Sequence, residues 1–181
     1  MRKAMAIKVK KLKVEKNHEF YEAVSDLLEH PVVNKMKEYP QHCGTDCYQH
    51  CLNVAYANFV ICKALGLNAR AAARAGMIHD LFLYDWHTYR KKTGKSFHGL
   101  THPRHALRIA EKYFSLTPLE KDIILHHMWP ITVAPPKSAE ALITTFTDKG
   151  CGLFEVGDYY LDKLLPKRPY PIKWLMSNIQ K

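Results

Sequence analysis

The sequence predicts an all-α fold, a compact helical bundle that forms a single domain. Along most of the 181-residue chain, apolar residues recur at intervals of three and four, the spacing of a helix face buried in a core. Helix-start signals precede several of these runs, and the clearest is Thr117-Pro118-Leu119-Glu120, a capping box with proline at the first helical position. A chain of this length is typical of one domain with its own core.

The first 40 residues divide into a tail and two short helices. Residues 1–16 are strongly basic and are expected to form a solvated arm, with packing on the body or a contact to nucleic acid or membrane as alternatives. Apolar residues follow helical spacing between Glu19 and Lys37, and His30-Pro31 interrupts the run. His18 and His30 are therefore expected to be surface or capping residues.

Two longer helices follow. The first is expected to begin after a cap at Thr45 or Asp46 and to end near Leu65, with Gly66 just beyond it. Asn68 is expected to cap the second, over Ala69–Phe82. The basic segment that comes next, residues 88–96, is either a lid or a plain solvated connection.

Prolines mark the ends of the remaining helices. Thr101 or His102 is expected to cap a helix that Pro103 opens. The helix that starts at the capping box must stop before Pro130, because the residue ahead of a proline avoids the helical region. The last main helix is expected from Ala139 to about Glu155.

These elements predict the domain boundaries. The helical domain covers residues 17–165, after the basic tail. Residues 166–181 are rich in proline and basic residues and are expected to form a surface tail with a short helix over Ile172–Ile179. No apolar run reaches the 18 or so residues that span a bilayer, and no leader segment is evident, so a soluble, cytoplasmic protein is expected.

Several histidines and aspartates lie on helix faces that are otherwise apolar and therefore expected to be buried. Buried imidazoles and carboxylates are costly unless they are paired or bind a metal. Adjacent residues of a helix point about 100° apart, so His126 and His127 can both face one site only because their helix ends there, and the conservative expectation is that one of the two is a ligand. The candidate ligands are His50, His79, Asp80, His102, His126, His127 and Asp148. Taken singly, each is as well explained by a hydrogen-bonded core histidine or a solvated aspartate.

The number of these ligands exceeds the needs of one ion and suits two, with a carboxylate between them. Mixed nitrogen and oxygen ligation fits iron or manganese best, and zinc, cobalt or nickel also, whereas all-oxygen magnesium sites are a poorer match. Three cysteines at intervals of four, Cys43, Cys47 and Cys51, are an alternative metal site, but they lack paired C-x-x-C knuckles and are expected to be reduced core thiols.

The order of the candidate ligands resembles the H…HD…D pattern of the HD superfamily of metal-dependent phosphohydrolases. The resemblance covers roughly residues 46–155 and implies a helical bundle of the HD-domain type. It implies that His50, His79, Asp80 and Asp148 hold the first metal and that His102, His126 and His127 belong to the second. Met128-Trp129-Pro130 follows the histidine pair in place of the HD-GYP signature, so cyclic dinucleotide cleavage is not expected.

The resemblance implies hydrolysis of a phosphate ester, in a nucleotide or another small phosphorylated compound, by a metal-activated water. Asp80 is the expected catalytic residue, as the carboxylate that bridges the two ions. Arg104, Lys137 and Lys149 are candidates for contacts with substrate phosphate, with solvated surface charge as the alternative for each. The formal net charge of +10 favours an anionic substrate.

The sequence also fits two other functions. Mixed-valent di-iron oxygenases of the same superfamily use a similar ligand set. A basic nucleic-acid-binding protein would instead use the tail, residues 1–16, and keep its metal as a structural element.

Overall fold

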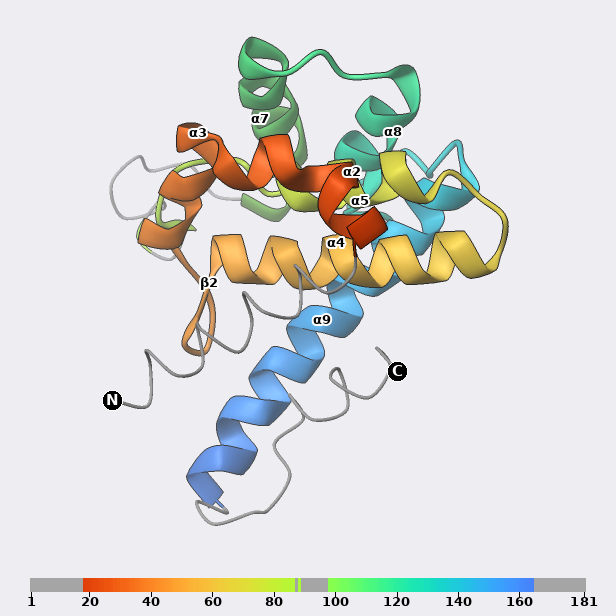
Figure 1. Ribbon diagram of the computed structural model, residues 1–181. Coiled ribbons are helices and arrows are strands. Elements are labelled where there is room, and N and C mark those ends of the chain that lie inside the picture. Colours follow the sequence, from red (N-terminus) through yellow and green to blue (C-terminus); the bar gives the residue numbers. More distant parts are fainter. Residues whose placement is uncertain (1–17, 87, 89–97, 165–181) are drawn as a thin grey trace.

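A computed structural model describes residues 18–86, 88 and 98–164 (Figure 1). Within these ranges the chain is almost entirely helical, with one hairpin of two very short strands, which confirms the predicted all-α fold. None of the described helices is both long enough and apolar enough to cross a membrane. The predicted tails 1–16 and 166–181 and nearly all of the predicted loop 88–96 lie outside the described residues.

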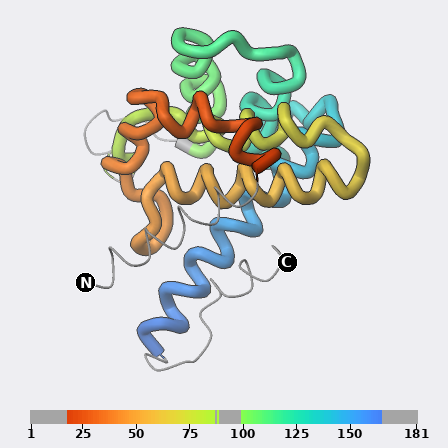
Figure 2. Tube along the Cα trace, in the orientation of Figure 1, coloured from red at the N-terminus to blue at the C-terminus, as the bar shows by residue number. Residues whose placement is uncertain are grey.

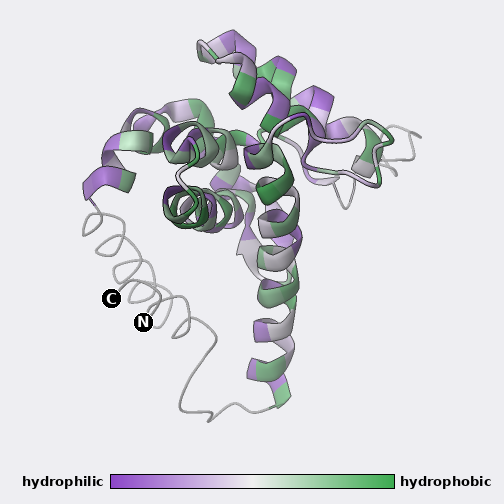
Figure 3. Cartoon of the chain, turned by 90° about the vertical axis from the view of Figure 1, so that its right-hand side faces the viewer, coloured by the Kyte–Doolittle hydropathy of each residue, from purple (hydrophilic) through white to green (hydrophobic). Residues whose placement is uncertain are grey.

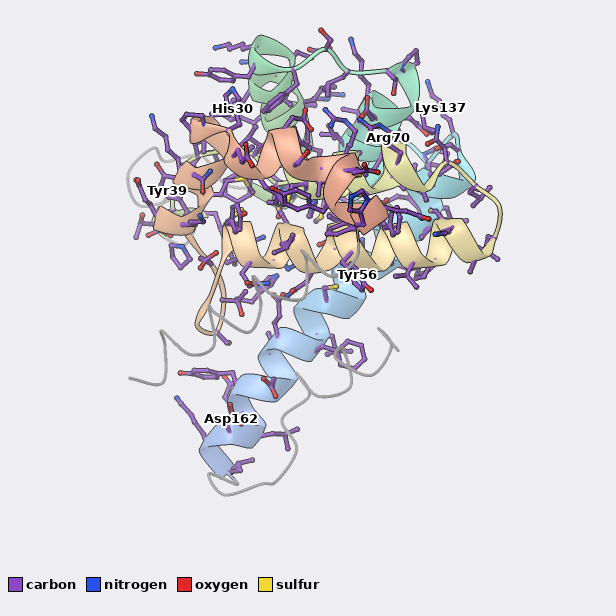
Figure 4. The ribbon with its side chains drawn as sticks, in the orientation of Figure 1. His30, Tyr39, Tyr56, Arg70, Lys137 and Asp162 are labelled. Carbon is purple, nitrogen blue, oxygen red and sulfur yellow. The ribbon has the colours of Figure 1, made fainter. Side chains whose placement is uncertain are left out.

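The predicted interruption at His30 is confirmed. Helix α2 covers His18–Glu29, α3 covers Pro31–Asn34, and the 3-10 helix η1 covers Lys35–Glu38. His30 caps α3, because its Nδ1 accepts a hydrogen bond from the Val32 amide at 3.2 Å. Its ring also packs edge-on against Phe114, which directly follows a later helix, so it lies between elements rather than in a site (Figure 4).

A small hairpin that the sequence did not predict precedes the first long helix. Strand β1, Pro40–His42, pairs antiparallel with β2, Thr45–Asp46. Cys43 and Gly44 form the turn with φ of 36° and 92°, the left-handed conformation that two-residue hairpin turns require and that glycine adopts without strain.

Helices α4 and α5 form the centre of the bundle. Asp46 caps α4, Cys47–Ala64, and Asn68 caps α5, Ala69–Ile78, as the sequence predicts. A Cβ on Gly76 would lie 2.9 Å from the Ala55 Cα, so only glycine permits the observed approach of the two backbones. Helix α2 covers α5 on another side (Figure 2).

Helix α5 is shorter than the predicted Ala69–Phe82, because it ends at Ile78 with His79 as its C-cap. The chain then turns, and Leu83 has a positive φ of 54°. Successive residues of a continuing helix point about 100° apart. The early end therefore allows His79 and Asp80 to turn their side chains toward the same point.

Three more helices complete the bundle. Helix α7, His98–Tyr113, begins before the predicted cap and contains Pro103 in its interior. Proline lacks a backbone N–H, so one helical hydrogen bond is missing there, but the helix continues on both sides. Helix α8, Pro118–His126, starts with the predicted capping box. Helix α9, Ala139–Leu164, is longer than predicted, and its C-terminal half extends beyond the other described elements (Figures 1 and 3).

Candidate metal centre

Six of the seven predicted metal ligands meet where the helices converge. They are His50 on α4, His79 and Asp80 just after α5, His102 on α7, His127 just after α8, and Asp148 on α9. All are buried except Asp148, which is partly exposed. Three overlapping sets of these residues place their ligand atoms within 4.8 Å of one another, close enough to hold a metal ion.

One end of the cluster is built around Asp148. Its Oδ1 lies 3.0 Å from Nε2 of His50 and 3.5 Å from Nε2 of His79. The same nitrogen of His79 is 3.7 Å from Oδ2 of Asp80. Two imidazole nitrogens and two carboxylates therefore face one small volume.

The other end of the cluster contains His102 and His127. Their Nε2 atoms are 2.9 Å apart, and they lie 3.2 and 3.5 Å from Oδ1 of Asp80. Two neutral imidazole lone pairs repel at this separation, so either one nitrogen carries a proton or both face a cation. Asp80 thus presents one carboxylate oxygen to each end of the cluster.

Three of the clustered histidines form a hydrogen bond through Nδ1, the ring nitrogen that faces away from the cluster. This hydrogen bond selects the tautomer of each ring. Nδ1 of His79 donates to the Gly76 carbonyl at 2.8 Å, and Nδ1 of His127 donates to the Ile124 carbonyl at 2.8 Å. Nδ1 of His50 donates to Glu155 Oε2 at 3.0 Å. A ring whose Nδ1 carries the proton directs its Nε2 lone pair into the cluster, which is how metal-bound histidines are oriented.

Two atoms at the centre are buried without a hydrogen bond. They are Nε2 of His79 and Oδ1 of Asp80. An unsatisfied buried polar atom destabilises the fold, and such atoms are rare in native structures. Both are good ligands for a transition metal, and a bound ion would remove the penalty on both. The donor set therefore fits divalent metal.

The charges within the cluster favour ionised carboxylates. Burial opposes this, but the adjacent imidazoles outweigh it and hold the pKa of Asp80 and of Asp148 well below the usual range. Burial also opposes the charge on His50, whereas its hydrogen bonds to Asp148 and Glu155 raise its pKa well above the usual value. A metal that binds Nε2 of His50 must therefore displace the proton that this nitrogen shares with Asp148.

Two residues that sequence analysis missed support the ligands. Gln41 Nε2 donates to Oδ2 of Asp80 at 2.6 Å, and Glu155 accepts from His50 and, through Oε1, from Asn53 Nδ2 at 2.8 Å. Glu155 follows Asp148 by two helical turns, so helical spacing could have identified it. Gln41 lies in the unpredicted hairpin, and no spacing signal marks it.

The structure does not bring His126 to this cluster. Its Nδ1 faces the other way, 2.7 Å from the Asp122 carboxylate and 3.0 Å from the Asp122 carbonyl. The two adjacent histidines at the end of α8 diverge as a helical backbone requires. Of this pair, only His127 contributes an atom to the clustered ligands.

The predicted phosphate contacts have different surroundings. Lys149 donates from Nζ to the carbonyls of His127 at 3.0 Å and Thr145 at 3.2 Å, so its ammonium group is occupied by two backbone carbonyls. Arg104 on α7 and Lys137 after α8 are exposed, and Lys137 lies at the periphery of the molecule (Figure 4).

The cysteines form no metal-binding group among the described residues. Cys43 is exposed in the hairpin turn, whereas Cys47 and Cys51 are buried and reduced. They line the cluster from behind, where Cys47 Sγ donates to the Asp80 carbonyl at 3.3 Å. Their expected role as core thiols fits this placement.

Comparison with known proteins gives one family. The family model of the HD domain matches residues 47–150, which is more than half of the chain. The match includes all six clustered ligands, whereas Gln41 and Glu155 lie outside it. No curated protein and no solved structure gives a significant match.

Proposed function

The chain belongs to the HD-domain family, and on this basis we propose that it is a metal-dependent phosphohydrolase. Its substrate in this proposal is a phosphate ester, either a nucleotide or another small phosphorylated compound. One observation carries the proposal: the buried imidazoles and carboxylates leave His79 Nε2 and Asp80 Oδ1 without hydrogen bonds at the centre of the ligand set.

We assign the ligands to two divalent ions. His50, His79, Asp80 and Asp148 would hold the first, and Asp80, His102 and His127 would hold the second, so that Asp80 serves both. The mixed set suits iron or manganese first, and zinc, cobalt or nickel also. Divalent ions bound in this way lower the pKa of a bound water and neutralise charge on phosphoryl oxygens.

The protein's own groups would orient this centre. Gln41 holds Oδ2 of Asp80 and so fixes the carboxylate plane between the two ends. The net charge of +10 favours an anionic substrate. Arg104 and Lys137 keep exposed charges that are free to meet a phosphate, whereas the Lys149 ammonium group is occupied by two carbonyls.

The test is a panel of nucleotides and phosphorylated metabolites, assayed for product with manganese, iron, cobalt or nickel supplied in turn. We expect hydrolysis that Asp80→Ala abolishes and that His102→Ala weakens severely. His105→Ala is the matched control, because His105 lies on the same helix outside the ligand groups and should leave hydrolysis intact.

Two outcomes would contradict the proposal. Hydrolysis that persists in Asp80→Ala would come from a contaminant. No hydrolysis across the panel, together with oxygen uptake by the iron-loaded protein, would instead support the oxygenase.

A further inference from the structure

The outer face of α9 carries no charged residue along the whole helix. We define this face by the positions that follow one another at intervals of three and four from Leu142: Phe146, Gly150, Leu153, Gly157, Tyr160 and Leu164. The large side chains on it are exposed, Leu153 by 73 % and Leu164 by 75 %. Asp148 and Glu155 project from the opposite side of the same helix, toward His50.

This composition is the reverse of that of an ordinary surface helix, which turns its charged side toward water. The C-terminal half of the outer face lies on the part of α9 that extends beyond the other described elements (Figures 1 and 3). A contiguous apolar surface of this kind marks an interaction site.

Two glycines indicate what kind of element fits the face. A Cβ built on Gly150 or on Gly157 would meet nothing within 4 Å, so nothing in the described structure requires glycine at either position. Glycine inside a helix is destabilising relative to alanine, but it allows a second backbone to approach closely. The two glycines therefore suit packing against another helix.

The outer face reads almost the same in both directions from Leu153. Its aromatic residues, its terminal leucines and its glycines are each placed nearly symmetrically about that residue. Phe146 and Tyr160 lie seven residues away, Leu142 and Leu164 eleven, and Gly150 and Gly157 three and four. A two-fold axis at Leu153 would pair each member with its counterpart on an identical helix, as a self-complementary interface requires.

We propose that a second copy of this chain docks on the outer face of α9, with the two α9 helices antiparallel about a two-fold axis at Leu153. Together with the neighbouring Phe154, the large side chains of the outer face are each exposed by 41–75 %. Since a whole aromatic side chain buries about 150–250 Å², their exposed parts amount to roughly 600 Å² per copy. A standard protein interface buries about 800 Å² per partner, so contacts beside the helix need to add little.

The length of the face favours a second copy over the chain's own C-terminal segment. The outer face spans about 33 Å at 1.5 Å per residue, and a second α9 has the same length. The C-terminal segment, residues 165–181, has 17 residues, which as a single helix would span about 26 Å and leave one end of the face uncovered.

Sedimentation of the full chain over a range of concentrations tests the proposal. We expect a dimer that Leu153→Glu weakens at least about a hundredfold, because the two glutamates would face each other at the axis. Val133→Glu, at a loop residue that is 93 % exposed, is the matched control and should leave the dimer unchanged. Far-UV circular dichroism establishes that both variants are folded. A wild-type monomer at every concentration, or a Leu153→Glu dimer of wild-type affinity, would overturn the proposal.

Cysteine cross-linking in a Cys43→Ser background tests the geometry. Leu153→Cys should form a disulfide with itself, and Leu142→Cys should cross-link only when mixed with Leu164→Cys. Self-linking of Leu142→Cys would mean a parallel pair and would overturn the antiparallel arrangement. A monomer in which the Leu153→Cys thiol gains reactivity when residues 165–181 are removed would assign the face to the C-terminal segment and overturn the proposal.

Discussion

Glu155 orients the ring of His50 in the candidate metal centre, although it lies outside the ligand groups that surround Asp80. It accepts the Nδ1 proton of His50 at 3.0 Å and is itself fixed by Asn53 at 2.8 Å. In Glu155→Gln the amide group must turn its NH₂ toward one of these two donors, so one hydrogen bond is lost. We expect metal affinity to fall about 10- to 100-fold, the usual effect of removing a partner that orients a ligand.

Competition with a chromophoric chelator measures this affinity. Glu140→Gln is the matched control, because Glu140 is a buried glutamate of the same helix that accepts from the Asn68 amide at 3.0 Å, away from the centre. It should change stability but not metal affinity. Equal loss of affinity in the two variants would mean that Glu155 acts only through the fold.

The thiols should differ widely in reactivity. Cys43 is exposed, whereas the other four cysteines are buried. Burial raises the pKa of Cys62 to about 11 and that of Cys151 to about 12, and the thiolate is the reactive form. We expect iodoacetamide at pH 8 to label one thiol quickly in the native protein and five after unfolding, as counted by mass spectrometry. Rapid native labelling of Cys151 would contradict the described packing.

Residue-level predictions from sequence succeeded where helical spacing carries the information. His50 and Asp148 each lie on the face that their spacing indicates, and the structure brings them together with His102, which was expected at a helix start and lies within α7. Spacing could not decide between His126 and His127, because that choice depends on where α8 ends. It could not place the Lys149 ammonium group either, because its partners are carbonyls supplied by the fold.

At the level of the elements, the contact between α4 and α5 sets the position of His79. Gly76→Ala would put a Cβ 2.8 Å from Asn58 Nδ2 and 2.9 Å from the Ala55 Cα, so the helices must separate. We expect a loss of about 1–3 kcal/mol in the free energy of unfolding. Metal affinity should fall as well, because the Gly76 carbonyl holds the His79 ring.

Urea denaturation and chelator competition check the two effects. Gly99→Ala is the control, since its Cβ would meet Met128 at an ordinary 3.6 Å, and it should be neutral or stabilising. An unchanged urea midpoint in Gly76→Ala would show that the close approach does not exist.

Arg74 joins three helices and gives the fold a pH dependence away from the metal centre. Its guanidinium donates to both carboxylate oxygens of Asp26 on α2 and to Glu120 on α8. The hydrogen bond from Arg74 lowers the pKa of Asp26 below 3.8. Because the pKa of Asp26 is lower in the folded state than in the unfolded state, its ionised form stabilises the fold at every pH above the unfolded-state pKa. This stabilisation is lost as the pH falls through the folded-state pKa.

Asp26→Asn should therefore be less stable than the wild type by a constant amount above about pH 5, and the difference should shrink as the pH falls below 3.8. Urea midpoints measured across this range check the trend. Glu38→Gln, at an exposed site on η1, should show no such difference. A gap between Asp26→Asn and wild type that widens toward low pH would reverse the assigned sign.

The elements themselves were predictable because their signals are local. Three helices begin at caps that the sequence predicts, namely Asp46, Asn68 and Thr117. The early end of α5 and the hairpin before α4 were not predictable, because both depend on how the chain must turn to meet the rest of the fold.

Across the whole molecule, the bundle brings the candidate ligands from five helices or helix ends to one point. No pair of neighbouring elements forms the centre alone, so it exists only in the folded chain. Helix α9 links this centre to the molecular surface, since Asp148 and Glu155 lie on its inner side and the apolar outer face lies opposite. The centre and the proposed dimer interface therefore share one rigid element.

Elemental analysis of protein purified without chelators shows whether the cluster around Asp80 binds metal. We expect about two transition-metal ions per chain, as the two-metal assignment requires. Asp80→Ala should lose both ions, whereas His30→Ala, which changes a histidine outside the cluster, should keep the wild-type content. A folded wild-type protein without transition metal, even after reconstitution with iron or manganese, or an Asp80→Ala variant with wild-type metal content, would contradict the account.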